Sequence, residues 1–216
     1  MLVPETVSEP TEITEADDGD LFLTVLDDAM AAMRAADIPF LLIGGIGSAV
    51  YGRDRSTRDI DLFVRPESAP RAVQALDAHG FDTRTVDVHW LSKAFKDGVL
   101  VDVIFRSSRD IYLDEQMLVR AEDMPFRGRW VPVAPPEDLV VMKAIAAAED
   151  TPRYWYDALA IVGHADLDWD YLVFRARQHG ARRILSLLLY ASSVDLLVPL
   201  EPIEALQEAV GSGRRA

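Results

Sequence analysis

The first half of the chain alternates between helical spacing and short apolar runs. Residues 21–36 repeat apolar side chains every three or four positions, a pattern typical of one face of a helix. The continuous apolar run 40–43 predicts a buried strand, 46–51 predicts a short helix, and 59–64 predicts a second strand. Two strands joined through a short helix are therefore expected early in the folded part.

The next segments predict one helix and several strands. Pro66 suits the first turn of a helix, which we expect to run to His79 and to stop at Gly80. Residues 86–95 and 99–105 predict two strands joined by a tight turn. Residues 111–133 predict a short helix and an irregular pair of strands.

After Pro135 the apolar residues recur at helical spacing. Pro135 and Pro136 suit the first turn of a helix, and the acidic Glu137 and Asp138 suit its positive N-terminal end. The helices that we expect beyond this point are 137–149, 152–163, 168–179, 182–197 and 202–210. The pattern thus predicts an α/β half at 21–134 and an α-helical half at 135–216.

Composition excludes several classes of protein. The chain has 216 residues, of which 50% are hydrophobic, and it contains no cysteine. Disulfides and thiolate metal sites are therefore excluded. No apolar run approaches the roughly 20 residues that span a bilayer, and the N-terminus lacks the basic start and apolar stretch of a secretory signal. We expect a cytoplasmic protein with no membrane partner.

The acidic charge is concentrated at the N-terminus. The formal net charge is −14, which argues against a nucleic-acid partner. Residues 1–20, however, carry seven acidic side chains and no lysine or arginine. We expect this segment to be a disordered acidic tail. The remaining body is only moderately acidic, so charge leaves the partner open.

Two short patterns carry the candidate chemistry. Gly44 and Gly45 follow the first strand, and Asp59 and Asp61 lie at the start of the second. Strand side chains alternate, so both carboxylates point to one face, where they would repel unless a cation such as Mg²⁺ lay between them. The glycines let the backbone approach a phosphate closely. Together these residues indicate an enzyme that handles a nucleoside triphosphate (NTP).

With a third carboxylate, Asp102, these residues resemble the nucleotidyltransferase fold of the DNA polymerase β superfamily. Gly47 and Ser48 belong to the same superfamily signature. Further matches indicate the branch that contains AbiEii-type toxins, over about residues 38–163: Gly52, Arg55, Thr57, Pro136-Glu137-Asp138-Leu139, Lys143 and Asp157. The resemblance implies an α+β protein. Its mixed β-sheet with flanking helices would be followed by an α-helical C-terminal domain.

The resemblance also implies roles for these residues. Asp59 and Asp61 would hold Mg²⁺, with Mn²⁺ as the alternative, and Asp102 would share a metal or accept the proton of the attacking group. The backbone at Gly44 and Gly45 would bind phosphates at a helix N-terminus. The remaining nucleotide-binding residues would be Ser48, Arg55, Thr57, Lys143 and Asp157.

Lysine is rare, which draws attention to Lys143. Only Lys93, Lys96 and Lys143 are present, and the helical neighbours of Lys143 are apolar. Its side chain therefore either extends outward or reaches into a cleft, where Asp157 would be its partner. Arginines cluster at 175–183, where a solvated face is favoured over a contact with RNA phosphates.

Three functional hypotheses remain. The first is a Mg²⁺-dependent nucleotidyltransferase that transfers NMP from an NTP to an acceptor hydroxyl. The AbiEii-like resemblance implies a toxin that acts on tRNA and is silenced by an antitoxin protein. The second changes the acceptor to an aminoglycoside-like small molecule or a protein side chain. The third is a non-catalytic nucleotide-binding module, against which the three intact aspartates argue.

Overall fold

One mixed sheet organises the first part of the protein. The computed structural model describes residues 15–52 and 57–212, and within them seven strands pair in the order β3-β4-β5-β2-β1-β7-β6. The two central strands β2 and β5 run parallel, whereas β1 and β4 flank them in antiparallel fashion. The strands are β1 (Phe40–Leu42), β2 (Asp59–Val64), β3 (Asp82–Asp87), β4 (Leu91–Lys96), β5 (Val99–Ile104), β6 (Glu122–Phe126) and β7 (Arg129–Val133).

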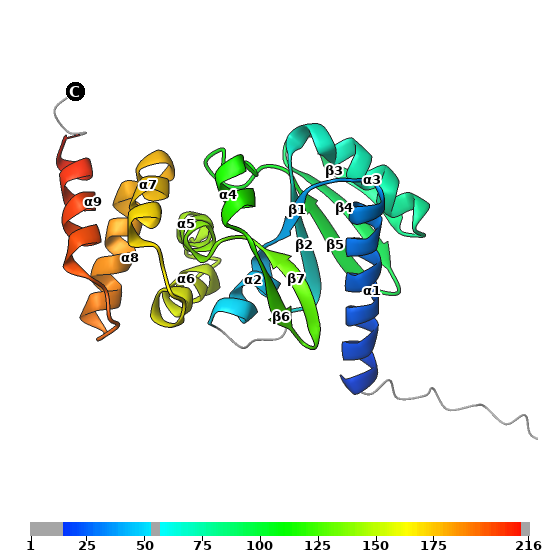
Figure 1. Cartoon of the computed structure of the whole chain (residues 1–216), viewed down its shortest axis with the longest axis horizontal. Helices are drawn as coiled ribbons and strands as arrows, with labels where there is room; N and C mark the ends of the chain where they lie inside the picture. Colours follow the sequence, from blue (N-terminus) through cyan, green and yellow to red (C-terminus); the bar gives the residue numbers. More distant parts are fainter. Residues whose placement is uncertain (1–14, 53–56, 213–216) are drawn as a thin grey trace, which may run out of the picture.

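Helices cover both faces of this sheet. Helices α1 (Glu15–Ala35) and α3 (Ala69–Ala78) pack against each other and contact β5 from one side (Figure 1). A short 3₁₀ turn, η1 (Pro66–Ser68), precedes α3. On the other side α2 (Gly44–Tyr51) packs against β2. The expected α+β architecture with flanking helices is therefore confirmed.

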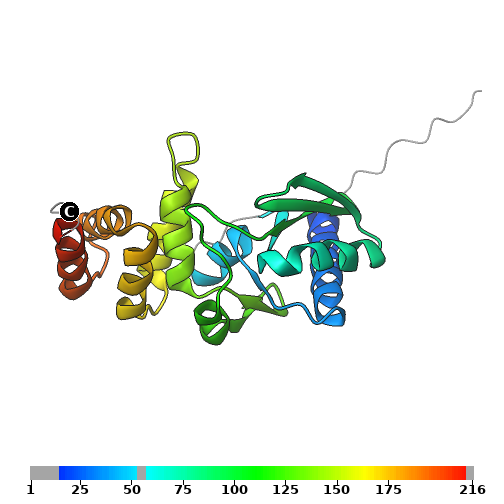
Figure 2. The ribbon, with the colours of Figure 1, turned by 90° about the horizontal axis from the view of Figure 1, so that it is seen from above.

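A helical region follows the sheet. Seen from above, these helices extend the molecule away from α1 (Figure 2). The small helix α4 (Glu115–Arg120) precedes β6, and α5 contacts α2, α6, α7 and α8. None of the helices in the described ranges is long and apolar enough to cross a bilayer. The C-terminal helices are α5 (Pro136–Ala146), α6 (Arg153–His164), α7 (Trp169–His179), α8 (Ala181–Ser193) and α9 (Leu200–Ser212).

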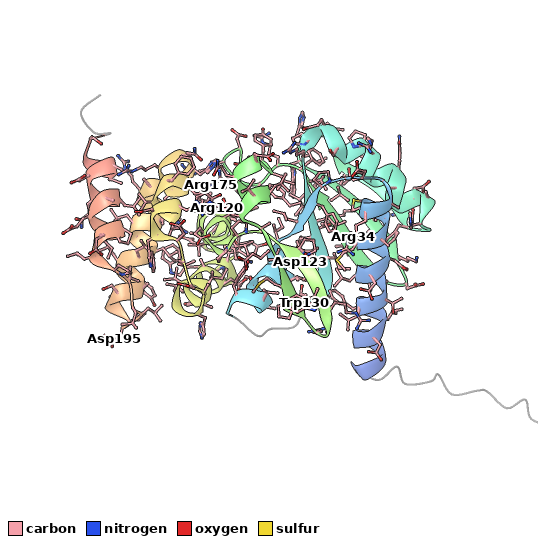
Figure 3. All side chains as sticks on the ribbon, in the orientation of Figure 1. Arg34, Arg120, Asp123, Trp130, Arg175 and Asp195 are labelled. Atoms are coloured by element: carbon pink, nitrogen blue, oxygen red, sulfur yellow. The ribbon has the colours of Figure 1, made fainter. Side chains whose placement is uncertain are left out.

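A buried ionic cluster joins this helical region to α4. Arg175 of α7 is only 2% exposed and donates to Asp138 of α5 and to Asp114, the N-cap residue of α4, each at 2.6 Å. Tyr171 donates to the same Asp138 at 2.8 Å. Figure 3 labels Arg175 and Arg120 where α4 and α7 meet. The expected solvated face at 175–183 is therefore wrong for Arg175, which is a structural cation.

Among the boundaries that differ from the expected ones, two change how the first part of the chain is read. Helix α1 already begins at Glu15, within the segment expected to be a tail. The expected strand 86–95 is two strands, β3 and β4, with a turn between them. β3 is an edge strand with a mostly exposed, polar sequence, so it lacks the apolar alternation by which strands are identified.

Candidate active site

Three carboxylates meet on one face of the central strands. Asp61 of β2 lies directly opposite Asp102 of β5 in the parallel register, and Asp59 precedes Asp61 by two positions. Because strand side chains alternate, all three point to the same face. They all line one cavity of about 870 Å³. The structure therefore brings together the three acids that the sequence singled out.

Gly44 makes room for the carboxylate of Asp61. Its φ of +58° is a left-handed conformation that favours glycine, and any side chain there would overlap Asp61 Oδ2. Burial, together with the charges of Asp59 and Asp102, raises the pKa of Asp61 to about 6, although Lys143 and the backbone N–H of Gly45 oppose the shift. The carboxylate is thus held at the start of α2 among like charges.

Asp102 has a cationic partner on the neighbouring strand. Lys93 of β4 pairs with Asp102 across the antiparallel ladder, and its Nζ lies 3.1 Å from Oδ1 of Asp102. Burial raises the pKa of Asp102, and the Lys93 ammonium opposes that rise. Asp102 is therefore held by a lysine on the neighbouring strand.

Thr57 orients Asp59. The Thr57 side chain is buried, and its hydroxyl donates to Oδ1 of Asp59 at 2.8 Å. The sequence placed Thr57 among the nucleotide-binding residues, whereas its visible contact is with a candidate metal ligand. Arg55, assigned to a phosphate in the same prediction, lies outside the described residues.

Lys143 and Asp157 form a buried pair beside the acids. Lys143 is 5% exposed, its Nζ lies 3.1 Å from Oδ2 of Asp157, and it lines the cavity. The expected pairing of these two residues is confirmed. Ser48 differs from its prediction. Its hydroxyl is fully buried and lies 3.0 Å from the carbonyl oxygen of Gly44 and 3.3 Å from Asp157 Oδ2, which places it behind the cavity wall.

The cavity has two chemically different sides. The helix side consists of residues from α5 and α6: Leu139, Met142, Lys143, Ala146, Arg153 and Tyr154. The hairpin side consists of residues from the β3–β4 turn and from the segment after β5: Asp87, His89, Trp90, Arg106, Ser107, Ser108 and Arg109. The three carboxylates lie on the sheet between these two sides.

Trp90 is the main aromatic group of the hairpin side. It is 42% exposed, and its Nε1 donates to Oδ2 of Asp87 at 3.1 Å. The other oxygen of Asp87 accepts the backbone N–H of His89 at 2.8 Å. The indole is therefore held in place with much of its surface free. Sequence reasoning missed Trp90 and Asp87 because it placed both inside a single strand.

The donor set fits a divalent cation at two of the three acids. Asp59 and Asp61 offer hard oxygen ligands, and the crowding that raises the pKa of Asp61 is the repulsion that a cation would relieve. Within the described ranges, however, no group of three or more His, Cys, Asp or Glu side chains is arranged to hold a metal ion. The metal-ligand role of Asp102 stays a prediction.

One protein-family model matches the chain. The model of a family described as "uncharacterised nucleotidyltransferase" matches residues 12–194, which is most of the chain. No curated protein matches it.

Several solved structures are similar at low identity. The antigenic nucleotidyltransferase-like protein from Paracoccidioides brasiliensis is 14% identical over 87% of this chain and 93% of that chain, with a TM-score of 0.49. ANT(2'')-Ia in complex with adenylyl-2''-tobramycin is 20% identical over 90% and 98%, with a TM-score of 0.46. The lincosamide antibiotic adenylyltransferase LnuA, bound to lincomycin, is 14% identical over 69% and 98%, with a TM-score of 0.45.

Proposed function

Because the chain belongs to the family of uncharacterised nucleotidyltransferases and is thus a nucleotidyl-transferring enzyme, we propose that it transfers NMP from an NTP to an acceptor hydroxyl with the help of Mg²⁺. One observation carries the assignment of the site: Asp59, Asp61 and Asp102 share a cavity with the N-terminus of α2 and with Lys143. A nucleotide-binding module without catalysis has no need for three crowded carboxylates.

Different residues of the site have different roles in the proposed reaction. Asp59 and Asp61 hold the cation, whose charge, when it is bound, offsets that of the triphosphate and of the departing pyrophosphate. The backbone at the start of α2 and the Lys143 ammonium bind phosphate oxygens. Asp102 accepts the proton of the attacking hydroxyl. Mn²⁺ is the alternative cation, because it takes the same oxygen ligands.

The hairpin side binds the acceptor in this account. It is adjacent to Asp102, the proposed proton acceptor. Asp102 and Ile104 lie on the same face of β5, Arg106 follows two positions later, and all three line the cavity. Trp90 offers an indole for stacking, and Arg109 and the Ser107 and Ser108 hydroxyls suit phosphate and sugar oxygens. These groups favour an RNA 3′ end, and the resemblance to AbiEii-type toxins suggests tRNA, with an antitoxin protein as the silencing partner. Such an enzyme would meet NTP and tRNA in the cytoplasm.

A cationic small molecule is the second candidate acceptor. The whole chain carries a net charge of −14, which would attract an aminoglycoside-like compound. Asp87 is the acid of the hairpin side, but both of its oxygens already accept hydrogen bonds from Trp90 and His89. This leaves less carboxylate for an ammonium group and makes RNA the preferred acceptor.

An acceptor assay distinguishes these possibilities. The full chain is incubated with Mg²⁺, each α-³²P-labelled NTP, and total tRNA, an aminoglycoside panel or a protein extract in parallel. We expect label in tRNA that is lost when the 3′ hydroxyl is oxidised with periodate. Label in the aminoglycosides or in protein alone would overturn the RNA assignment, and the absence of label in every reaction would contradict nucleotidyl transfer.

A further inference from the structure

A row of charged side chains crosses four adjacent strands at one register. Arg84 of β3 pairs with Lys93 of β4, Lys93 pairs with Asp102 of β5, and Asp102 pairs with Asp61 of β2. Residues directly opposite each other in neighbouring strands share a face of the sheet. The row therefore changes from two cations to two carboxylates between β4 and β5, at the edge of the candidate active site.

The central pair of this row is well shielded. The side chains of Lys93 and Asp102 are 27% and 15% exposed, and the ammonium lies at ion-pair distance, 3.1 Å from Oδ1. That oxygen is buried and accepts no hydrogen bond from any other described residue. An ion pair shielded from solvent is stronger than an exposed one, because water screens it less.

The other two lysines show that this pairing is specific to the site. Lys96, three positions further along β4, pairs with Asp28 of α1 at 2.7 Å. Because this spacing is an odd number of residues, Lys96 points to the opposite face of the sheet from Lys93. Lys143 pairs with Asp157. Lys93 is thus paired directly with one of the three active-site carboxylates.

We propose that Lys93 is a built-in cation that occupies Asp102, so that the site binds one divalent cation, through Asp59 and Asp61, and not two. The inference rests on the proposed function. Three carboxylates carry three negative charges, and the Lys93 ammonium offsets one of them. One divalent cation then neutralises the remaining two, whereas a second would have to displace the ammonium from Asp102.

This arrangement also gives Lys93 a positioning role. It holds one oxygen of Asp102 toward β4, away from a cation shared by Asp59 and Asp61. That agrees with the described residues, in which no three carboxylates converge as metal ligands. Asp102 is then kept for the attacking hydroxyl, and Lys93 acts through Asp102 without touching the substrate.

Counting bound Mn²⁺ tests the proposal without relying on activity. The full chain is titrated with Mn²⁺ alone, and the free ion is followed by electron paramagnetic resonance. We expect one tight Mn²⁺ site in the wild type. In Lys93→Gln we expect a second site, which binds Mn²⁺ at least about tenfold more tightly than any secondary site of the wild type. Lys93→Arg should keep a single site because it restores the cation. Lys96→Gln, on the same strand, should also keep one.

A double variant identifies the residue to which the second ion binds. Adding Asp102→Asn to Lys93→Gln should return the count to one, because the carboxylate released by the lysine is then gone. Circular dichroism confirms that each variant is folded, and Lys93→Met, which removes the charge but keeps a side chain of similar length, carries the test should Lys93→Gln not fold. Two comparable sites in the wild type, or one site in folded Lys93→Gln, would overturn this inference and leave the proposed metal site standing. No tight site in the wild type, or one that Asp61→Asn leaves unchanged, would overturn the proposed metal site and this inference with it.

Discussion

The carboxylate of Asp61 lies where a side chain at position 44 would have to be. Gly44 begins α2 with a φ of +58°, and Asp61 Oδ2 fills the space beside its Cα. The glycine pair that the sequence associated with a phosphate therefore has a second task, which is to admit a carboxylate to the N-terminus of this helix. The backbone at Gly44 and the carboxylate of Asp61 can therefore only be placed together.

Replacing Gly44 by alanine should disable the site. The methyl group would both strain the left-handed backbone and displace Asp61, so we expect a loss of more than about 1 kcal/mol of stability together with loss of nucleotidyl transfer. Gly80→Ala is the matched control, because Gly80 has a φ of +82° with no atom close to the added methyl. Chemical denaturation and transfer assays on both variants check this. Full activity in Gly44→Ala would contradict the account.

Asp61 should destabilise the metal-free protein at neutral pH. Its pKa is about 6 in the folded protein, against an ordinary value of 3.8. Between about pH 4 and pH 6 the folded state keeps a proton that the unfolded chain has released, so the contribution of this group to stability falls as pH rises through that window. Above pH 6 the penalty is on the order of 3 kcal/mol.

Asp61→Asn removes this penalty. In EDTA at pH 7.5 we expect the variant to unfold at a higher temperature than the wild type, with the difference vanishing near pH 4. Mg²⁺ should then stabilise the wild type and leave the variant unchanged, because a ligand raises stability only where it binds the folded state. Asp123→Asn, at an exposed position of β6, is the control. A variant less stable than the wild type at pH 7.5 would show that crowding does not strain the site.

Trp90 should act on the acceptor and not on the nucleotide. Stacking on an aromatic side chain contributes about 1–3 kcal/mol, so Trp90→Ala should raise the KM for the acceptor roughly 10- to 100-fold. The KM for NTP should stay within about twofold, because in this proposal the phosphates are bound by Lys143 and the start of α2 and not by the hairpin side. Trp130→Ala is the control, since Trp130 is 67% exposed on β7 and does not line the cavity (Figure 3). Equal effects on both KM values would contradict the division of the cavity into two sides.

Local rules made part of this site predictable. The strand period of two placed Asp59 and Asp61 on one face, and the apolar run around Asp102 marked its strand. The partnership of Lys143 with Asp157 followed from the scarcity of lysine and from family resemblance. Each of these inferences depends on residues that are close in sequence or on a motif.

The remaining features depend on strand pairing or on contacts between distant segments. Lys93 meets Asp102 because the tight turn at 97–98 fixes the register of β4 and β5, a consequence of the predicted turn that sequence reasoning missed. Arg175 lies in a basic stretch, yet it is buried because Asp114 and Asp138, far away in the chain, converge on it. Likewise, the Ser48 hydroxyl turns toward Asp157 because α2 packs against α6.

The position of the transferred label tests the central claim most directly. The protein is incubated with Mg²⁺, total tRNA and NTP labelled with ³²P at either the α- or the γ-phosphate, in the wild type, Asp59→Asn and Asp61→Asn. We expect α-label in the acceptor, γ-label in pyrophosphate only, and loss of both products in the two variants. Transfer of γ-label to the acceptor, or α-label transfer that survives in either variant, would contradict nucleotidyl transfer at this carboxylate pair.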